Sequence, residues 1–173
     1  YGAGVHGALW HSQSVEALYA HRPGLKVVIP STAYDAKGLL IAAIRDPDPV
    51  MFFEHKKGYR LIKDEVPDGD YTVPIGAARV AREGHDLTVI SYGLMLHHCL
   101  EAAQSLTADN ISAEVIDLRT VSPLDKATIL DSVKRTGKCL VVTEDTISFS
   151  ITGEIAAIIN EEAFEYLDGP VLR

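Results

Sequence analysis

Leu87-Thr88-Val89-Ile90-Ser91-Tyr92 is an apolar run rich in β-branched residues, and a second such run, Ala113-Glu114-Val115-Ile116-Asp117-Leu118, follows it. Between the two runs, over Met95–Leu106, apolar residues recur every three or four positions. Apolar β-branched runs are typical of buried strands, and the intervening spacing is typical of one face of a helix. Two buried strands joined by a helix predict parallel pairing beneath covering helices, so we expect an α/β fold.

The same alternation continues on both sides of this stretch. Toward the carboxyl end we expect a helix over 125–134, a strand over 139–143, a helix over 150–164 and a strand beginning at Val171. Toward the amino end we expect a helix over 15–20, a strand over 26–30, a helix over 33–45 and a strand over 50–54. The polar, turn-rich stretch 61–75 is typical of a linker. The sequence therefore predicts two units, 1–60 and 76–173, made of mainly parallel sheets with helices on both faces.

Helix boundaries carry their own signals. A side-chain oxygen just before a helix can accept hydrogen bonds from its first N–H groups, and the candidates are Ser12 or Ser14, Ser31 or Thr32, and Ser122 or Asp125. Asp46-Pro47-Asp48-Pro49 ends the 33–45 helix, because proline lacks an N–H group and restrains the preceding residue. Two acids there lie beside helix-end carbonyls of partial negative charge. They form either a solvated helix stop or a hard-cation site with oxygens from Asp46 and Asp48.

Composition excludes several classes of protein. Of the 173 residues, 47% are hydrophobic and 23% are charged, which provides enough apolar side chain for a core and excludes intrinsic disorder. The net charge is −8 and no run is rich in lysine and arginine, so we expect no nucleic-acid partner. The longest apolar stretches are far below the ~18 residues that a membrane helix needs, so we expect no membrane span. Cys99 and Cys139 lie far apart without a C-x-x-C motif, which fits a reducing compartment and excludes a disulfide scaffold.

The Gly-rich start of the chain and the histidines are candidate functional features. Gly2-Ala3-Gly4-Val5-His6-Gly7 matches G-x-G-x-x-G, but no strand precedes it, so a loop passing close to something bulky is the better interpretation. No histidine pair has zinc-ligand spacing, and the neighbours His97 and His98 would point about 100° apart on a helix. His11 precedes a helix, where reactive groups collect in α/β folds. On this evidence it is either catalytic or an ordinary loop histidine beside capping serines.

Several stretches together are more specific than any single motif. They resemble, in consistent order over essentially the whole chain, the beta subunit of thiamine-diphosphate-dependent 2-oxo acid dehydrogenases of the pyruvate and branched-chain type. The stretches are Gly7–Ala17, Pro23–Ser31, Asp35–Leu40, Glu114–Asp125, Val142–Glu144 and Gly153–Ala156. The stretch 146–152 departs from the family, whose members are richer in glycine there, so its role in partner contact is not carried over.

The resemblance implies a domain organisation. Residues 1–60 would be the tail of a pyrimidine-binding thiamine diphosphate domain, and 76–173 a transketolase C-terminal-type domain that is incomplete at its end. The family subunit is longer, so we expect this chain to be a fragment at both ends. The family's activating glutamate belongs to a segment outside these residues, and no cofactor-binding residue is assigned here.

The resemblance also implies a chemistry. Thiamine diphosphate attacks a 2-oxo acid, carbon dioxide leaves, and the acyl group passes to a lipoyl carrier. His11 matches the family's active-site histidine, with Ser12 and Gln13 as supports. Magnesium would be held by the alpha subunit, and potassium by the Ala43 carbonyl with Asp46 and Asp48. The expected partners are an alpha subunit in a heterotetramer of two alpha and two beta subunits, and the dihydrolipoyl acyltransferase core with its lipoyl domain.

Other members of this enzyme group remain as alternatives. An acetoin dehydrogenase beta subunit is built alike, whereas a transketolase fits the His11-Ser12-Gln13-Ser14 context less well. A non-catalytic assembly module that docks the alpha subunit and the acyltransferase core is an alternative of a different class. We expect the chain alone to be inactive. We expect the protein to lie in either bacterial cytoplasm or the mitochondrial matrix. The sequence does not name the 2-oxo acid.

Overall fold

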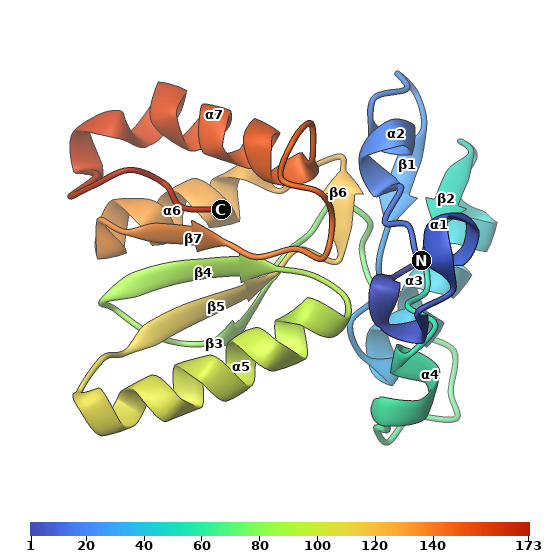
Figure 1. The fold of residues 1–173 in the computed structure, drawn as a ribbon. Helices are drawn as coiled ribbons and strands as arrows, with labels where there is room; N and C mark the ends of the chain where they lie inside the picture. Colours follow the sequence, from blue (N-terminus) through green and yellow to red (C-terminus); the bar gives the residue numbers. More distant parts are fainter.

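The computed structural model describes all residues from Tyr1 to Arg173, and its strands form two sheets (Figure 1). The smaller sheet has the order β2-β1-β6 and the larger has the order β3-β5-β4-β7. The strands are β1 (Lys26–Val28), β2 (Val50–Phe52), β3 (Arg79–Arg82), β4 (Leu87–Ser91), β5 (Ala113–Asp117), β6 (Thr120–Ser122) and β7 (Cys139–Val141). The helices are α1 (Ala8–His11), α2 (Glu16–Ala20), α3 (Ala33–Arg45), α4 (Gly58–Leu61), α5 (Leu94–Leu106), α6 (Lys126–Thr136) and α7 (Ile151–Ala163). Three 3-10 turns complete the elements: η1 (Ala3–Val5), η2 (Thr107–Asp109) and η3 (Phe164–Tyr166).

Parallel pairing occurs where strand–helix units were predicted. Strand β1 pairs in parallel with β2, and β4 pairs in parallel with both β5 and β7. The terminal segment adds a parallel bridge between Leu140 and Leu172. Strands β3 and β6 were not predicted from the sequence, and they pair antiparallel with β5 and β1 respectively. The α/β fold is therefore confirmed, with mixed sheets.

The larger sheet is covered on both faces, as Figure 1 shows: α5 lies on one side, and α6 and α7 lie on the other. Successive residues of a strand point to opposite faces. Accordingly Val89 belongs to the apolar cluster with Leu96 of α5, whereas Ile90 belongs to the cluster with Ile155 and Ile159 of α7. Burial of these aliphatic side chains, each contributing roughly 1.5–3 kcal/mol, holds the three layers together.

The smaller unit is built around β1 and α3. Thr32 caps α3 through a hydrogen bond from the Asp35 N–H group to its Oγ1, one of the two candidates expected there. Leu39 of α3 packs with Val28 and with Val73 of the connecting segment. Gly38 makes this contact close, because a Cβ atom there would lie 2.5 Å from Val73 Cγ2.

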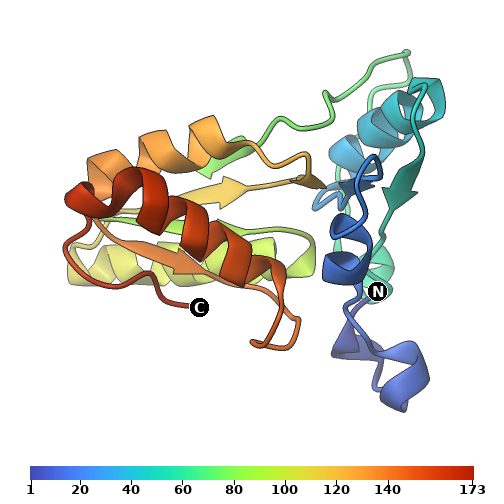
Figure 2. The same ribbon diagram turned by 90° about the horizontal axis from the view of Figure 1, so that it is seen from above.

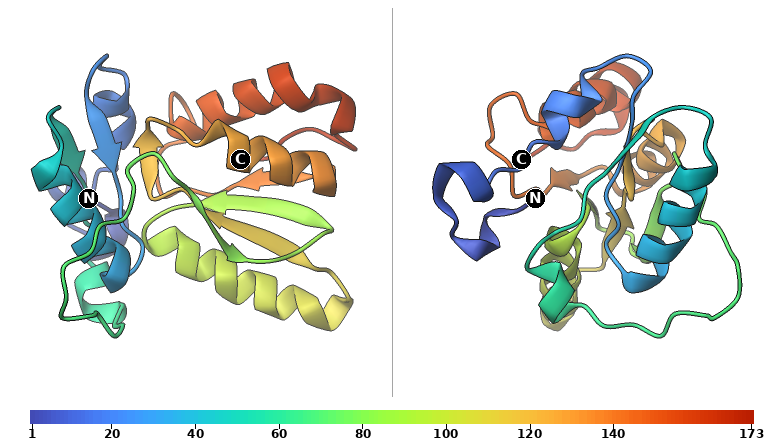
Figure 3. Two further views of the ribbon diagram at one scale, coloured as in Figure 1. Left: turned by 180° about the vertical axis from the view of Figure 1, so that it is seen from behind. Right: turned by 90° about the vertical axis from the view of Figure 1, so that its right-hand side faces the viewer.

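Two features join the units. The segment from Ile62 to Ala78 contains no helix or strand and crosses from one unit to the other as an extended loop, seen in Figures 2 and 3. Strand β6 follows the larger sheet in sequence but pairs with β1 of the smaller one, with Val27 opposite Ser122. The carboxyl half of the chain thus completes the amino-terminal sheet, and the two units share backbone hydrogen bonds.

No helix of this fold has both the length and the apolar character that a bilayer crossing requires. Cys99 and Cys139 are both buried and free. Burial raises the pKa of the Cys139 thiol to about 12, so this group packs as a thiol rather than reacting as a thiolate.

Candidate functional site

His11 is the last residue of α1, a single exposed helical turn. The turn follows η1, and both His6, which precedes the turn, and Ala8, its first residue, have φ of 53°, in the left-handed region. Residues other than glycine adopt this region rarely, so surrounding contacts must hold the turn in its shape. The His11 carbonyl accepts a hydrogen bond from Lys56 Nζ, while its imidazole lies exposed. The side chain is therefore available to a group bound by another surface.

The serines near His11 act differently from the prediction. Ser12 Oγ accepts a hydrogen bond from the Gly7 N–H group at 2.6 Å, which closes the turn around α1. Ser14 Oγ is buried without a partner, and Val15 occupies the N-cap position of α2. The expected capping of this helix by Ser12 or Ser14 is wrong, because the Ser12 hydroxyl is engaged by the preceding loop.

The Gly-rich start passes close to a bulky side chain, as expected. Gly2 has φ of 106°, and a Cβ atom there would lie 2.2 Å from Nε2 of His55. The Gly2 N–H group donates to the Gln13 carbonyl at 3.2 Å, so residues 2 and 13 form the base of one loop that contains His11.

A buried acid lies directly after this loop. Glu16 of α2 is fully buried, and its Oε1 accepts a hydrogen bond from the Tyr92 hydroxyl at 2.7 Å. Its Oε2 has no partner within the chain. Burial raises the pKa of Glu16, since the charged form loses its water. Sequence reasoning missed this contact, because its two residues are 76 positions apart.

The predicted potassium residues lie together at the end of α3. Lys26 Nζ lies 2.7 Å from Asp46 Oδ1 and 3.1 Å from Asp48 Oδ2. The hydrogen bond from Lys26 lowers the pKa of Asp46. The Ala43 carbonyl accepts only a long hydrogen bond, 3.4 Å, from the Asp46 N–H group. Lys26 therefore supplies a positive charge beside the two acids. The placement of these acids at the carboxyl end of a helix does not by itself require a bound ion.

A second buried network joins the two units. Arg119 Nη1 lies 3.1 Å from Asp35 Oδ1, and Arg79 Nη2 lies 3.3 Å from Asp117 Oδ2. The Ser31 hydroxyl donates to Asp117 Oδ1 at 2.7 Å, so Ser31 does not cap α3. Desolvation raises the pKa of Asp117 to about 6, although the Ser31 hydrogen bond and the Arg79 charge oppose this shift. Asp35 belongs to the amino-terminal unit and Asp117 to the carboxyl-terminal unit. The network therefore fixes the position of one unit relative to the other.

The neighbouring histidines of α5 have separate partners. His97 Nε2 lies 2.7 Å from the Ser31 carbonyl, in the network between the units. His98 Nδ1 lies 3.7 Å from Glu101 on the exposed face. The two rings therefore face different groups, and no group of three or more His, Cys, Asp or Glu side chains is arranged to hold a metal ion.

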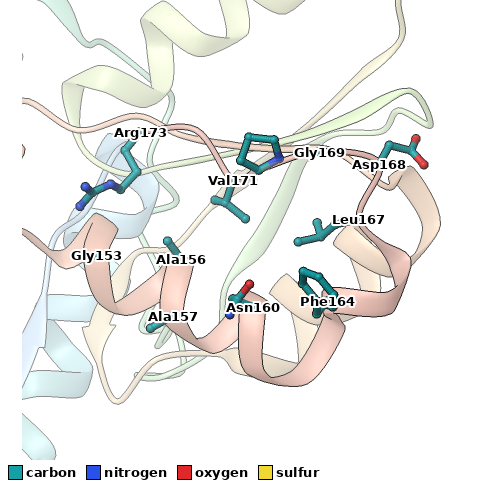
Figure 4. A pocket seen from close by; sticks show the side chains of 11 residues that line it. Gly153, Ala156, Ala157, Asn160, Phe164, Leu167, Asp168, Gly169, Val171 and Arg173 are labelled. Atoms are coloured by element: carbon teal, nitrogen blue, oxygen red, sulfur yellow. The ribbon is translucent and has the colours of Figure 1, made fainter.

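The surface around His11 is apolar and open. Trp10 is 83% exposed and Leu9 is 68% exposed. Three cavities, of about 750, 730 and 270 Å³, lie in the fold, and His11 lines none of them. The first lies between α7 and the carboxyl-terminal segment, where Figure 4 shows Asn160, Phe164 and Val171 around it.

These features define a class: a two-domain α/β protein with an exposed histidine turn at the edge of the contact between its domains. The family follows from comparison. Residues 76–173 match the transketolase C-terminal domain, and residues 1–62 match the transketolase pyrimidine-binding domain. The chain belongs to this transketolase-type family.

Relatives match the chain over its whole length. It is 63% identical to the 2-oxoisovalerate dehydrogenase subunit beta of Bacillus subtilis and 55% identical to the pyruvate dehydrogenase E1 component subunit beta of the same organism. Each match covers 100% of this chain and 53% of the relative, so the chain spans about half their length. An acetoin:2,6-dichlorophenolindophenol oxidoreductase subunit beta of Cupriavidus necator is 52% identical over 94% of the chain and 48% of the relative.

A solved structure has the same fold. A split-gene transketolase, described as an inactive beta4 tetramer, superposes with a TM-score of 0.77 at 25% identity. The superposition covers 94% of this chain and 52% of the other.

Proposed function

We propose that these residues serve in the beta subunit of a 2-oxo acid dehydrogenase, which decarboxylates a 2-oxo acid with thiamine diphosphate and passes the acyl group to a lipoyl carrier. The observation that carries the proposal is the exposed His11 turn, with its imidazole free and Trp10 and Leu9 uncovered beside it. Exposed apolar surface next to a polar reactive group is typical of a site completed by a partner. The identity of 63% to a 2-oxoisovalerate dehydrogenase subunit beta supports this assignment.

His11 is the catalytic residue of the proposal. Its imidazole can hydrogen-bond a substrate carbonyl or donate a proton to an opening lipoyl disulfide. Ser12 and Gln13 support it through the loop contacts that they make with Gly7 and Gly2.

The cofactor would be shared with other surfaces. When bound, thiamine diphosphate would supply an electron sink for the carbanion that loss of carbon dioxide leaves on the former carbonyl carbon. His11 lines none of the three cavities described above, and we assign no contact between this chain and the cofactor. In the proposal the alpha subunit holds magnesium, and potassium would use the Ala43 carbonyl beside Asp46 and Asp48.

The proposed partners follow from the relatives. An alpha subunit would cover the apolar surface at Trp10 in a heterotetramer, and the lipoyl domain of a dihydrolipoyl acyltransferase core would deliver the acceptor. We place the domain boundaries at 1–60, 61–75 and 76–173. We place the protein in bacterial cytoplasm or the mitochondrial matrix, where the free thiols Cys99 and Cys139 would stay reduced.

The test uses the intact beta subunit that contains these residues, purified with its alpha subunit, thiamine diphosphate and magnesium. Carbon dioxide release from 3-methyl-2-oxobutanoate and from pyruvate is measured, and acylation of an added lipoyl domain is followed by mass spectrometry. We expect release with at least one 2-oxo acid together with lipoyl acylation. Release from neither acid would contradict the proposal.

An acetoin dehydrogenase beta subunit is a second candidate, favoured by the 52% identity to the Cupriavidus necator protein. The same preparation distinguishes the two, since cleavage of acetoin with reduction of dichlorophenolindophenol and no turnover of 2-oxo acids would favour the alternative. A non-catalytic assembly module would instead bind its partner chains and turn over none of these compounds.

A further inference from the structure

Glu144 lies just after β7 and contacts two segments of the amino-terminal unit. Its Oε2 lies 2.6 Å from His55 Nε2, and its Oε1 accepts a hydrogen bond from the Ala3 N–H group at 2.8 Å. The side chain of Glu144 is 14% exposed and that of His55 is 3% exposed. One carboxylate therefore holds two partners that lie 89 and 141 residues away in the sequence.

The neighbours of His55 determine which of its ring nitrogens carries the proton. The Gly58 N–H group donates to His55 Nδ1 at 3.3 Å, so Nδ1 is an acceptor. The proton of the neutral ring is then on Nε2, from which it is donated to Glu144. This arrangement satisfies both ring nitrogens, and it aims His55 at the carboxylate rather than at solvent.

The contact extends to the base of the His11 loop. Gly2 packs so closely on His55 that no larger residue fits there, and its N–H group bonds to the Gln13 carbonyl. Ala3, which Glu144 holds, begins the turn that leads to α1. The Lys56 side chain, next to His55, bonds the His11 carbonyl. Both the start and the end of the loop are thus tied to the segment that Glu144 holds.

We propose that Glu144 is a positioning residue, which fixes the His11 loop from the carboxyl-terminal domain through the Ala3 N–H group and His55. The expected effect of Glu144 on catalysis rests on the function proposed above. Through these contacts Glu144 fixes the backbone of the turn that carries His11, and this turn has no buried residue of its own. A misplaced catalytic group can lose on the order of a hundredfold in rate.

The first experiment measures the loop itself. Amide hydrogen exchange of residues 2–13 is compared in this chain and in Glu144→Ala and Glu144→Gln. We expect Glu144→Ala to accelerate exchange at Ala3 at least tenfold. Glu144→Gln keeps one acceptor oxygen for two donors, so we expect an intermediate rate. Glu161→Ala, which removes an exposed acid from α7, is the matched control and should leave exchange unchanged. Wild-type exchange at Ala3 in Glu144→Ala would overturn the proposal.

The second experiment measures turnover in the intact beta subunit with its alpha subunit. We expect Glu144→Ala to lower kcat by about ten- to a hundredfold. Glu144→Gln should recover part of that loss, and the heterotetramer should keep its wild-type mass. Faster loop exchange with unchanged kcat would mean a purely structural contact and would overturn the positioning role. Absence of turnover in the wild-type complex would contradict the proposed function instead, and the exchange experiment would still decide whether Glu144 holds the loop.

Discussion

At the scale of single residues, His11 and Asp117 lie in opposite environments. His11 lies exposed at the end of α1, where a bound molecule can reach it. Asp117 is fully buried between the two units and is engaged by Ser31 and Arg79. Exposure leaves the imidazole of His11 accessible, whereas burial makes the ionisation of Asp117 costly to the folded state.

Replacing His11 with alanine should remove catalysis without loosening the fold. In the assembled complex we expect acyl transfer to the lipoyl domain to fall by about 100-fold or more. The free energy of unfolding should change by no more than about 0.5 kcal/mol, because His11 is exposed. Steady-state kinetics and urea unfolding measure the two effects. His21→Ala, at an exposed histidine after α2, is the control, and wild-type turnover in His11→Ala would contradict the assignment.

Asp117 should contribute a specific pH dependence to stability. Its pKa rises from 3.8 to about 6 on folding, so the folded state binds the proton more tightly than the unfolded chain. Its contribution to stability is therefore fully present below pH 3.8 and is lost as the pH rises through about 6. We expect the unfolding free energy of wild type, relative to Asp117→Asn, to decrease between these pH values.

Urea unfolding of both proteins across this range measures the difference. Asp109→Asn, at an exposed acid of η2, should follow the wild-type curve. A constant difference between wild type and Asp117→Asn would show that Asp117 titrates alike in both states.

At the scale of elements, local signals specify most of the helices and the parallel strands. Asp125 caps α6 as expected, and the apolar runs at β4 and β5 are strands because both faces of that sheet are covered. The two missed strands are short and pair antiparallel with partners far along the chain. Thr120–Ser122 has only three residues, which is too few for a recognisable period, and its partner Val27 lies in the other unit. Pairing over such distances is not encoded in any local pattern.

The capping of α6 by Asp125 should contribute measurably to the free energy of unfolding. Asp125 Oδ1 accepts a hydrogen bond from the Thr128 N–H group at 3.1 Å, and Oδ2 accepts one from the Ala78 N–H group at 2.9 Å. We expect Asp125→Ala to lower the unfolding free energy by about 1–2 kcal/mol. Asp131→Ala removes an exposed acid from the same helix and should cost less than about 0.5 kcal/mol. Equal effects of the two changes in urea unfolding would contradict the capping role.

At the scale of the whole molecule, the two units are joined by contacts that only the folded chain creates. The β6–β1 pairing, the Glu16–Tyr92 hydrogen bond and the Asp35–Arg119 ion pair all cross between them. The sequence pointed to His11 through the resemblance of its surroundings to a known family. It gave no sign of Glu144 or Glu16 as neighbours of that loop, because their partners are brought together by tertiary packing alone.

Breaking the ion pair between the units should destabilise the whole fold. Arg119→Met keeps much of the side-chain volume but leaves Asp35 buried, 2% exposed, without this partner. Removing one partner of a buried pair typically costs about 3–5 kcal/mol. Arg45→Met breaks the exposed pair with Asp70 and should cost no more than about 1 kcal/mol. Thermal unfolding of both variants measures the contrast, and similar losses would show that the contact between the units contributes little.

The central claim is that this chain supplies His11 to an active site that other surfaces must complete. The most direct test adds thiamine diphosphate, magnesium and a 2-oxo acid to these 173 residues alone, and in parallel to the intact beta subunit assembled with its alpha subunit. Carbon dioxide release is measured in both. We expect release from the assembled complex and none from the chain alone. Appreciable release from the chain alone would contradict this claim.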